Sequence, residues 1–153
     1  MSEQQPFFNI ERIYLKDLSL EIPNAPQVYA EREAPNIDIS LHNEARPLDG
    51  GAFEVVLTAT VTAKVKDKTA FLVEVAQAGI FQIRNVPQQE LEAILGVTCG
   101  NILFPYLRES ISNVVVRGGF PPFLLSHLSF EALYQQQREQ QQRQAGAATP
   151  PAA

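Results

Sequence analysis

The residues that most often carry out chemistry are few in this chain and lie far apart. The two histidines, His42 and His127, have no neighbouring metal ligand at the spacing of a known metal site. The one cysteine, Cys99, lacks a CxxC partner. The pairs Gly50-Gly51 and Gly118-Gly119 do not fit either phosphate-binding glycine motif. We interpret all of these as ordinary structural or surface residues.

Catalysis needs a nucleophile, a base or a metal whose ligands converge on one point. Two carboxylates can meet in any fold, so an acid/base pair stays open, but no motif points to one. The sequence therefore predicts no catalytic residue, no metal site and no cofactor.

The charge balance narrows the class of partner. The 153 residues include 12 Lys and Arg against 17 Asp and Glu, which gives a net charge of −5. Nucleic acids and anionic membranes need clustered basic residues, so we expect neither as a partner, whereas a basic partner fits. One cysteine allows no intramolecular disulfide, which fits a reducing compartment. The polar N-terminus is not a secretory signal, and no apolar run approaches a membrane span, so we expect a cytoplasmic protein without membrane insertion.

The first half of the chain reads as strands, because apolar and polar residues alternate. The expected strands are residues 7–22, 36–42, 53–66 and 69–83, the last two joined as a hairpin by a turn at 66–68.

The second half changes to helical periodicity. A short helix should begin near Pro87 and stop around Gly96. Asn101 should cap a longer helix that has Pro105 in its first turn and ends at Gly118-Gly119. Ser129 should cap a last helix that continues into the glutamine-rich stretch 135–144.

This order of elements predicts an α+β fold, a four-stranded antiparallel sheet with long C-terminal helices. We expect a flexible N-terminus at 1–6, a single domain at 7–144 and a disordered Ala/Pro tail at 145–153.

Three features suggest binding. The apolar crossover 120–125 either covers the core or offers a groove to a partner. Asp17, Ser19 and Glu21 alternate onto one strand face, which is either a solvated face or a docking patch for a basic partner. The long helix is apolar on more than one side, which favours an oligomer interface. We place that interface at Ile102, Tyr106, Ile111 and Val114.

Seven stretches, in order, resemble the SecB protein-export chaperone family. They lie between about residues 8 and 135, and NILFPY is the most specific of them. The stretches are 12–19 (RIYLKDLS), 23–26 (PNAP), 53–57 (FEVVL), 69–75 (TAFLVEV), 79–81 (GIF), 101–106 (NILFPY) and 117–121 (RGGFP). The glutamine-rich helix end and the Ala/Pro tail have no informative match.

The resemblance implies a homotetramer, built as a dimer of dimers with the long helices at the tetramer interface. Members of the family bind unfolded precursor proteins, keep them competent for translocation and deliver them to SecA, the ATPase of the translocon. The partner segment of SecA is its basic, zinc-bearing C-terminal tail, and that zinc belongs to SecA.

The resemblance also assigns site residues. The SecA-docking surface of the family maps onto Asp17, Glu21, Leu72 and Glu74. The client-binding groove maps onto the crossover and the last helix, at Phe120, Phe123, Leu124, Leu125, Phe130, Leu133 and Tyr134.

Three alternatives stay open at this point. The chain could be a general holdase of the same fold without an export role, a small-ligand or enzymatic domain, or a purely structural oligomer.

Overall fold

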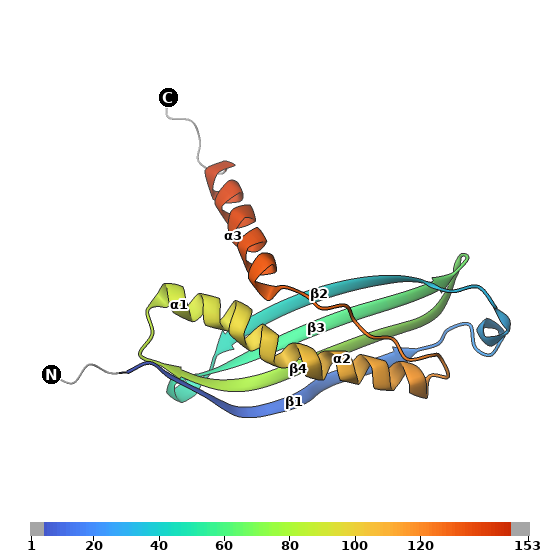
Figure 1. Ribbon diagram of the computed structural model, residues 1–153, viewed down its shortest axis with the longest axis horizontal. Coiled ribbons are helices and arrows are strands. Elements are labelled where there is room, and N and C mark those ends of the chain that lie inside the picture. Colours follow the sequence, from blue (N-terminus) through green and yellow to red (C-terminus); the bar gives the residue numbers. More distant parts are fainter. Residues whose placement is uncertain (1–4, 148–153) are drawn as a thin grey trace.

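Four strands of alternating apolar and polar residues form one antiparallel sheet (Figure 1). A computed structural model describes residues 5–147. The strands are β1 (Phe7–Glu21), β2 (Asn36–Pro47), β3 (Ala52–Val65) and β4 (Lys68–Arg84), and they lie in the order β1-β4-β3-β2. The 3₁₀ turns η1 (Gln27–Ala30) and η2 (Asp49–Gly51) lie on either side of β2 in the chain. The predicted four-stranded α+β fold is confirmed, although β2 runs five residues beyond its predicted end.

The hairpin of β3 and β4 forms the centre of the sheet. Its two-residue turn begins at Lys66, whose φ of 56° is typical of the first position of a tight hairpin turn. The strand face that we call the inner face is apolar and buried beneath the helices. The opposite face, the outer face, carries threonines and charged residues and has no helix over it in Figure 1.

The helical layer is more continuous than predicted. Helix α1 (Gln88–Ala93) passes through a π-helical turn, η3 (Ile94–Thr98), directly into α2 (Cys99–Arg117). The predicted stop at Gly96 is therefore wrong. The predicted cap at Asn101 and the first-turn position of Pro105 are also wrong, because both residues lie inside α2.

A contact from β2 accounts for the missing stop. A π-helical turn breaks the regular pattern of backbone hydrogen bonds. The Asn43 side-chain amide donates to the carbonyl oxygens of Leu95 and Gly96, each at 3.4 Å. The sheet thus supports the turn from outside the helix, an interaction that local sequence does not reveal.

The remaining helix ends follow the predictions. Helix α2 ends at Gly118, and Gly119 then takes a φ of 85°, the left-handed conformation that terminates helices. Helix α3 (Phe130–Ala147) begins after Ser129, whose hydroxyl oxygen accepts a hydrogen bond from the amide of Ala132 at 3.2 Å. Figure 1 shows α3 projecting away from the sheet, while α2 lies across it.

Helix α2 directs its main apolar stripe at its own sheet. Leu103, Leu107 and Ile111 are fully buried there, and Val114 is nearly so. Of the predicted oligomer-interface residues, Ile111 and Val114 therefore face the sheet of their own chain, because residues three and four apart share one helix face. The interface itself stays a prediction. Ile102 and Tyr106 lie on the sides that remain partly or largely open.

Two boundary predictions fall only partly within the described residues. Helix α3 continues to Ala147, three residues into the predicted tail, and 148–153 lie outside the described range, as do 1–4 of the predicted N-terminus. Within residues 5–147, no helix is long and apolar enough to cross a membrane, and no group of three or more His, Cys, Asp or Glu residues could hold a metal ion.

Cys99 should be unreactive in the folded protein. Its side chain is fully buried, and burial raises the pKa of the thiol to about 12, so almost no thiolate exists at pH 8. A thiol-reactive chromogenic disulfide should label Cys99 at least about a hundredfold faster in urea than in buffer. Equal rates in the two solvents would show that the thiol is not buried.

Candidate functional site

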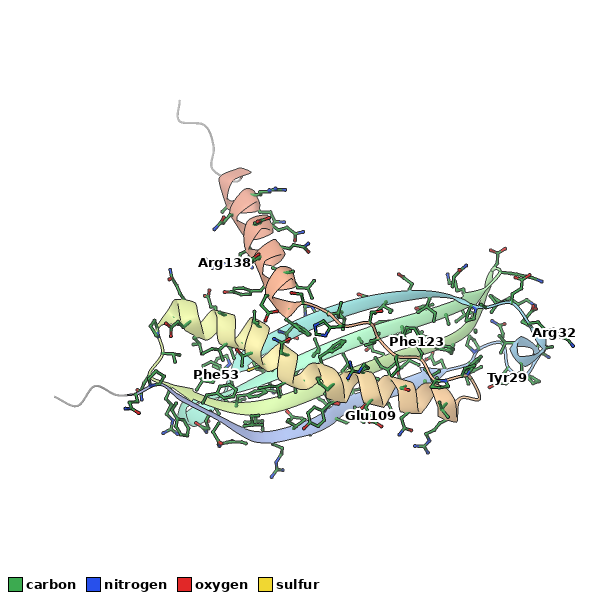
Figure 2. The ribbon with its side chains drawn as sticks, in the orientation of Figure 1. Tyr29, Arg32, Phe53, Glu109, Phe123 and Arg138 are labelled. Atoms are coloured by element: carbon green, nitrogen blue, oxygen red, sulfur yellow. The ribbon has the colours of Figure 1, made fainter. Side chains whose placement is uncertain are left out.

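An apolar cavity of about 410 Å³ lies between β2, the crossover and the base of α3. Leu57 of β3 contributes to its lining, as do Ile39 and Leu41 of β2. The crossover and α3 supply six of the seven residues predicted for the groove. They are Phe123, Leu124, Leu125, Phe130, Leu133 and Tyr134. The structure therefore brings these six side chains together at one site. Figure 2 labels Phe123 on the crossover, alongside the strands.

Two glycines allow the base of α3 to form one wall of the cavity. A Cβ added at Gly96 would lie 2.9 Å from the Tyr134 ring, and one added at Gly100 would lie 2.6 Å from the Phe130 ring. The glycines are four residues apart, as are the two aromatic residues, so each pair lies on one helix face. Larger residues at 96 and 100 would displace the rings, which makes this contact specific to glycine.

The cavity is open to solvent at its rim. Leu124 is 70% exposed, and Ile39 and Leu133 are 40% and 37% exposed. Leu125 and Phe130 are buried beneath them. Exposed apolar side chains around an apolar hollow are typical of a site for another apolar chain, since burial of such surface stabilises a complex by about 25 cal/mol per Å².

Polar side chains are a minority of the cavity lining. His42, Asn43, Ser126 and Gln137 are the polar residues of the lining. The side-chain oxygen of Asn43 is buried and accepts no hydrogen bond from any of the described residues.

Phe120, the seventh predicted groove residue, does not line this cavity. Its ring centroid lies 4.9 Å from that of Phe71 and 5.3 Å from that of Tyr29. Tyr29 is fixed by its own hydroxyl, which donates to the carbonyl oxygen of Gly118 at 2.7 Å. The crossover thus has one anchored end at Phe120, and only its continuation reaches the cavity.

Sequence reasoning missed the half of the cavity that β2 and β3 contribute. Ile39 and Leu41 alternate onto one apolar face of β2, but nothing local connects that face to a helix some 90 residues later in the chain. The available signal was the number of apolar residues on this strand and on the last helix, since each segment carries more of them than one contact with the core requires.

The acidic residues of the predicted docking patch gather on the outer face. Glu21 lies opposite Leu72 on β4, Ser19 opposite Glu74, and Asp17 opposite Ala76. Opposite residues in antiparallel strands share a face, so Asp17, Glu21, Leu72 and Glu74 form one patch. None of its three carboxylates forms an ion pair within the described part of the chain. The patch therefore carries uncompensated negative charge.

A second cluster of polar side chains, the Glu54 cluster, lies beside this patch, and its one carboxylate is paired with three neighbouring side chains. Glu54 of β3 is only 5% exposed, although it lies on the outer face. Its carboxylate accepts hydrogen bonds from Lys16 at 2.8 Å, Arg46 at 2.9 Å and the Tyr14 hydroxyl. The hydrogen bonds from Lys16 and Tyr14 lower the pKa of Glu54 to about 2, against the opposing effect of burial. Glu54 is consequently ionised across the physiological pH range.

Comparison with known proteins points to one family. A family model described as preprotein translocase subunit SecB matches residues 1–141. The chain is 63% identical over 147 residues to the protein-export protein SecB of Methylobacillus flagellatus, covering 96% of this chain and 94% of the relative. It is 56% identical over 148 residues to the protein-export protein SecB of Nitrosospira multiformis, covering 97% and 93%.

A solved structure shares the fold. The SecB-like chaperone of Mycobacterium tuberculosis, determined in complex with a peptide from an antitoxin, superposes with a TM-score of 0.66 at 20% identity. The match covers 80% of this chain and 91% of that one.

The Glu54 cluster should stabilise the fold in a pH-dependent manner. Glu54→Gln should lower the free energy of unfolding at pH 7 by about 1.5–3 kcal/mol, the value of a hydrogen bond to a charged group. Because the folded-state pKa lies below the ordinary value of 4.5, this stabilisation is complete above pH 4.5 and is lost as the pH falls toward 2. Urea unfolding at pH 7 and pH 3, at one protein concentration, measures the difference.

Glu74→Gln is the matched control, since Glu74 is exposed and should change stability by less than about 0.5 kcal/mol. A Glu54→Gln deficit as large at pH 3 as at pH 7 would contradict the proposed role of the charge.

Proposed function

We propose, since the chain belongs to the SecB family of preprotein translocase subunits, that it is a protein-export chaperone. It binds non-native precursor proteins, keeps them translocation-competent and delivers them to the SecA ATPase in the cytoplasm. The observation that carries this proposal is the open apolar cavity between β2, the crossover and α3.

The cavity suits an unfolded client. A folded protein hides its apolar segments, whereas an unfolded chain offers an apolar side chain to the cavity at every few residues. The exposed rim at Leu124 and Leu133 lets such a chain extend beyond the cavity in either direction. One short segment also loses conformational and rotational freedom on binding, so its net affinity is modest. Selectivity then favours slowly folding proteins, which stay unfolded long enough to bind.

Assembly into a homotetramer, a dimer of dimers, would raise that affinity. Linked grooves bind successive segments of one client at a high effective concentration. The inner side of β1 supplies an apolar surface for a second copy, since Phe8, Ile10, Leu15 and Leu18 are each about 40–50% exposed. The outward side of α2 supplies a second surface, where Tyr106 is 49% exposed and Ile102 is partly buried. Two surfaces on different elements allow two kinds of interface.

The acidic patch supports delivery to SecA. Asp17, Glu21 and Glu74 present unpaired carboxylates around the partly exposed Leu72, which matches a basic segment with an apolar side chain. We assign this patch to the basic, zinc-bearing C-terminal tail of SecA. Charge steering of this kind raises the association rate and weakens with salt. No catalytic residue, cofactor or metal ion of this chain takes part, and the client is released by transfer to SecA.

Substitution in the cavity should weaken client binding. Leu124→Asp and Phe123→Asp each place a carboxylate in the apolar site, where its desolvation is costly, so binding of a reduced, unfolded precursor should weaken by at least about tenfold. Ala30→Asp, on the exposed turn η1, adds the same charge away from the cavity and should bind normally. Fluorescence anisotropy with a labelled precursor measures the affinities. Normal binding by a correctly assembled Leu124→Asp protein would show that the groove lies elsewhere.

Charge reversal in the patch should separate docking from client binding. Asp17→Lys/Glu74→Lys should weaken binding of a SecA C-terminal tail peptide by about tenfold or more, while binding of an unfolded precursor is retained. Asp38→Lys/Glu44→Lys makes the same change in net charge at exposed positions of β2 and is the matched control. Calorimetry at two salt concentrations measures the affinity of both variants for the tail peptide. Unchanged tail affinity in the patch variant would favour a general holdase without an export role.

A further inference from the structure

The outward position of the acidic patch depends on a β-bulge in β1. After an earlier shift between Ile10 and Arg12, the pairing of β1 with β4 is regular from Arg12 opposite Ile80 to Leu15 opposite Gln77, and it then resumes at Asp17 opposite Ala76. Lys16 is therefore an extra residue, and both it and Asp17 lie against Ala76. Without the extra residue, strict alternation would turn Asp17 and Glu21 to the inner face. The bulge thus sets which face of the sheet carries the patch.

The side chain of Lys16 reaches a partner on a strand that is not adjacent to β1. Its ammonium group lies 2.8 Å from the carboxylate of Glu54 on β3, so it crosses β4 to reach it. The Tyr14 hydroxyl binds the same carboxylate. On this face of β4, Ile80 lies opposite Glu54, while Ala78 and Ala76 lie opposite Tyr14 and Asp17, and the small side chains of the two alanines leave room for both crossings. Glu54 therefore holds β1 at the bulge and two residues before it.

The apolar residues of β1 hold the strand only in part, since several of them are incompletely buried. Leu18 points to the inner face but is 40% exposed, whereas Leu20, two residues later on the same face, is partly buried against the core. Burial of these apolar side chains thus accounts for only part of the stability of the register that β1 adopts against β4 after the bulge. A charge-assisted hydrogen bond to a buried carboxylate is a strong additional constraint.

We propose that Lys16 and Glu54 are a positioning pair that holds the bulge of β1 and so presents Asp17 and Glu21 outward, beside Glu74, for the basic partner. The pair acts on the patch through the backbone of β1, and neither member needs to contact the partner. The claim that the pair holds the bulge concerns this chain alone. The claim that the bulge favours docking of the partner rests on the proposed function.

Electrostatics and positioning predict opposite results for one substitution. Lys16→Met removes a positive charge next to an acidic patch, so Coulomb interaction alone would strengthen binding of a basic peptide. If Lys16 positions the patch, the same substitution should weaken binding of the SecA tail peptide by about tenfold, the effect of one charge-assisted hydrogen bond. It should also speed amide hydrogen exchange of residues 15–21 by about tenfold.

Two controls complete the experiment on the full-length oligomer. Lys64→Met removes the same charge at an exposed position on the outer face of β3, away from β1, so it should leave exchange of residues 15–21 unchanged and should not weaken binding. Lys16→Arg keeps the cation and should restore both. Exchange of residues 15–21 that is unchanged in Lys16→Met, or tighter binding of the tail peptide by that variant, would overturn the proposal. A wild-type protein that does not bind the tail peptide would refute the docking function, while the exchange comparison still decides the role of Lys16.

Discussion

A single helix is too narrow to cover the apolar face of a four-stranded sheet. Neighbouring strands lie about 4.8 Å apart, so four of them span about 15–20 Å, whereas one helix with its side chains is about 10 Å wide. Helix α2 covers β3 and β4, whose inner residues are almost fully buried. The inner residues of both edge strands stay partly exposed, with Ile39 on β2 and Leu15 on β1 as examples. This uncovered apolar surface is the source of the binding properties proposed for the protein.

The two edges differ in what lies over them. The crossover and the base of α3 lean over β2 and convert its apolar residues into a cavity with a fixed shape. On β1, the end of α2 reaches the inner side at Leu20 and Ile22, which leaves the apolar residues from Phe8 to Leu18 partly exposed and available to another copy of the chain. The outer face is polar and carries both the acidic patch and the Glu54 cluster. On the proposed function, client and SecA would meet surfaces that differ from each other and from the two proposed for subunits.

Sequence patterns predicted the elements well where the structure depends on local order, as in the hairpin of β3 and β4 and the cap at Ser129. They failed where a contact with a distant segment of the chain determines the local structure. The helix passes through Gly96 because Asn43 of β2 supports the turn there, and Phe120 leaves the groove because Tyr29 and Phe71 hold it. The bulges of β1 were detectable, since the spacing of its apolar residues changes from two to three at 10–13 and again at 15–18. The cavity itself required the tertiary arrangement.

The central claim is that the uncovered apolar surface captures chains that have not folded. The most direct measurement mixes the protein, without nucleotide, with one disulfide-containing precursor in two forms, reduced and unfolded or oxidised and folded, and measures complex formation by calorimetry and size-exclusion chromatography. We expect a stable complex with the unfolded form, with the negative heat-capacity change of apolar burial, and none with the folded form. Equal binding of the two forms, or no complex with either, would contradict this account.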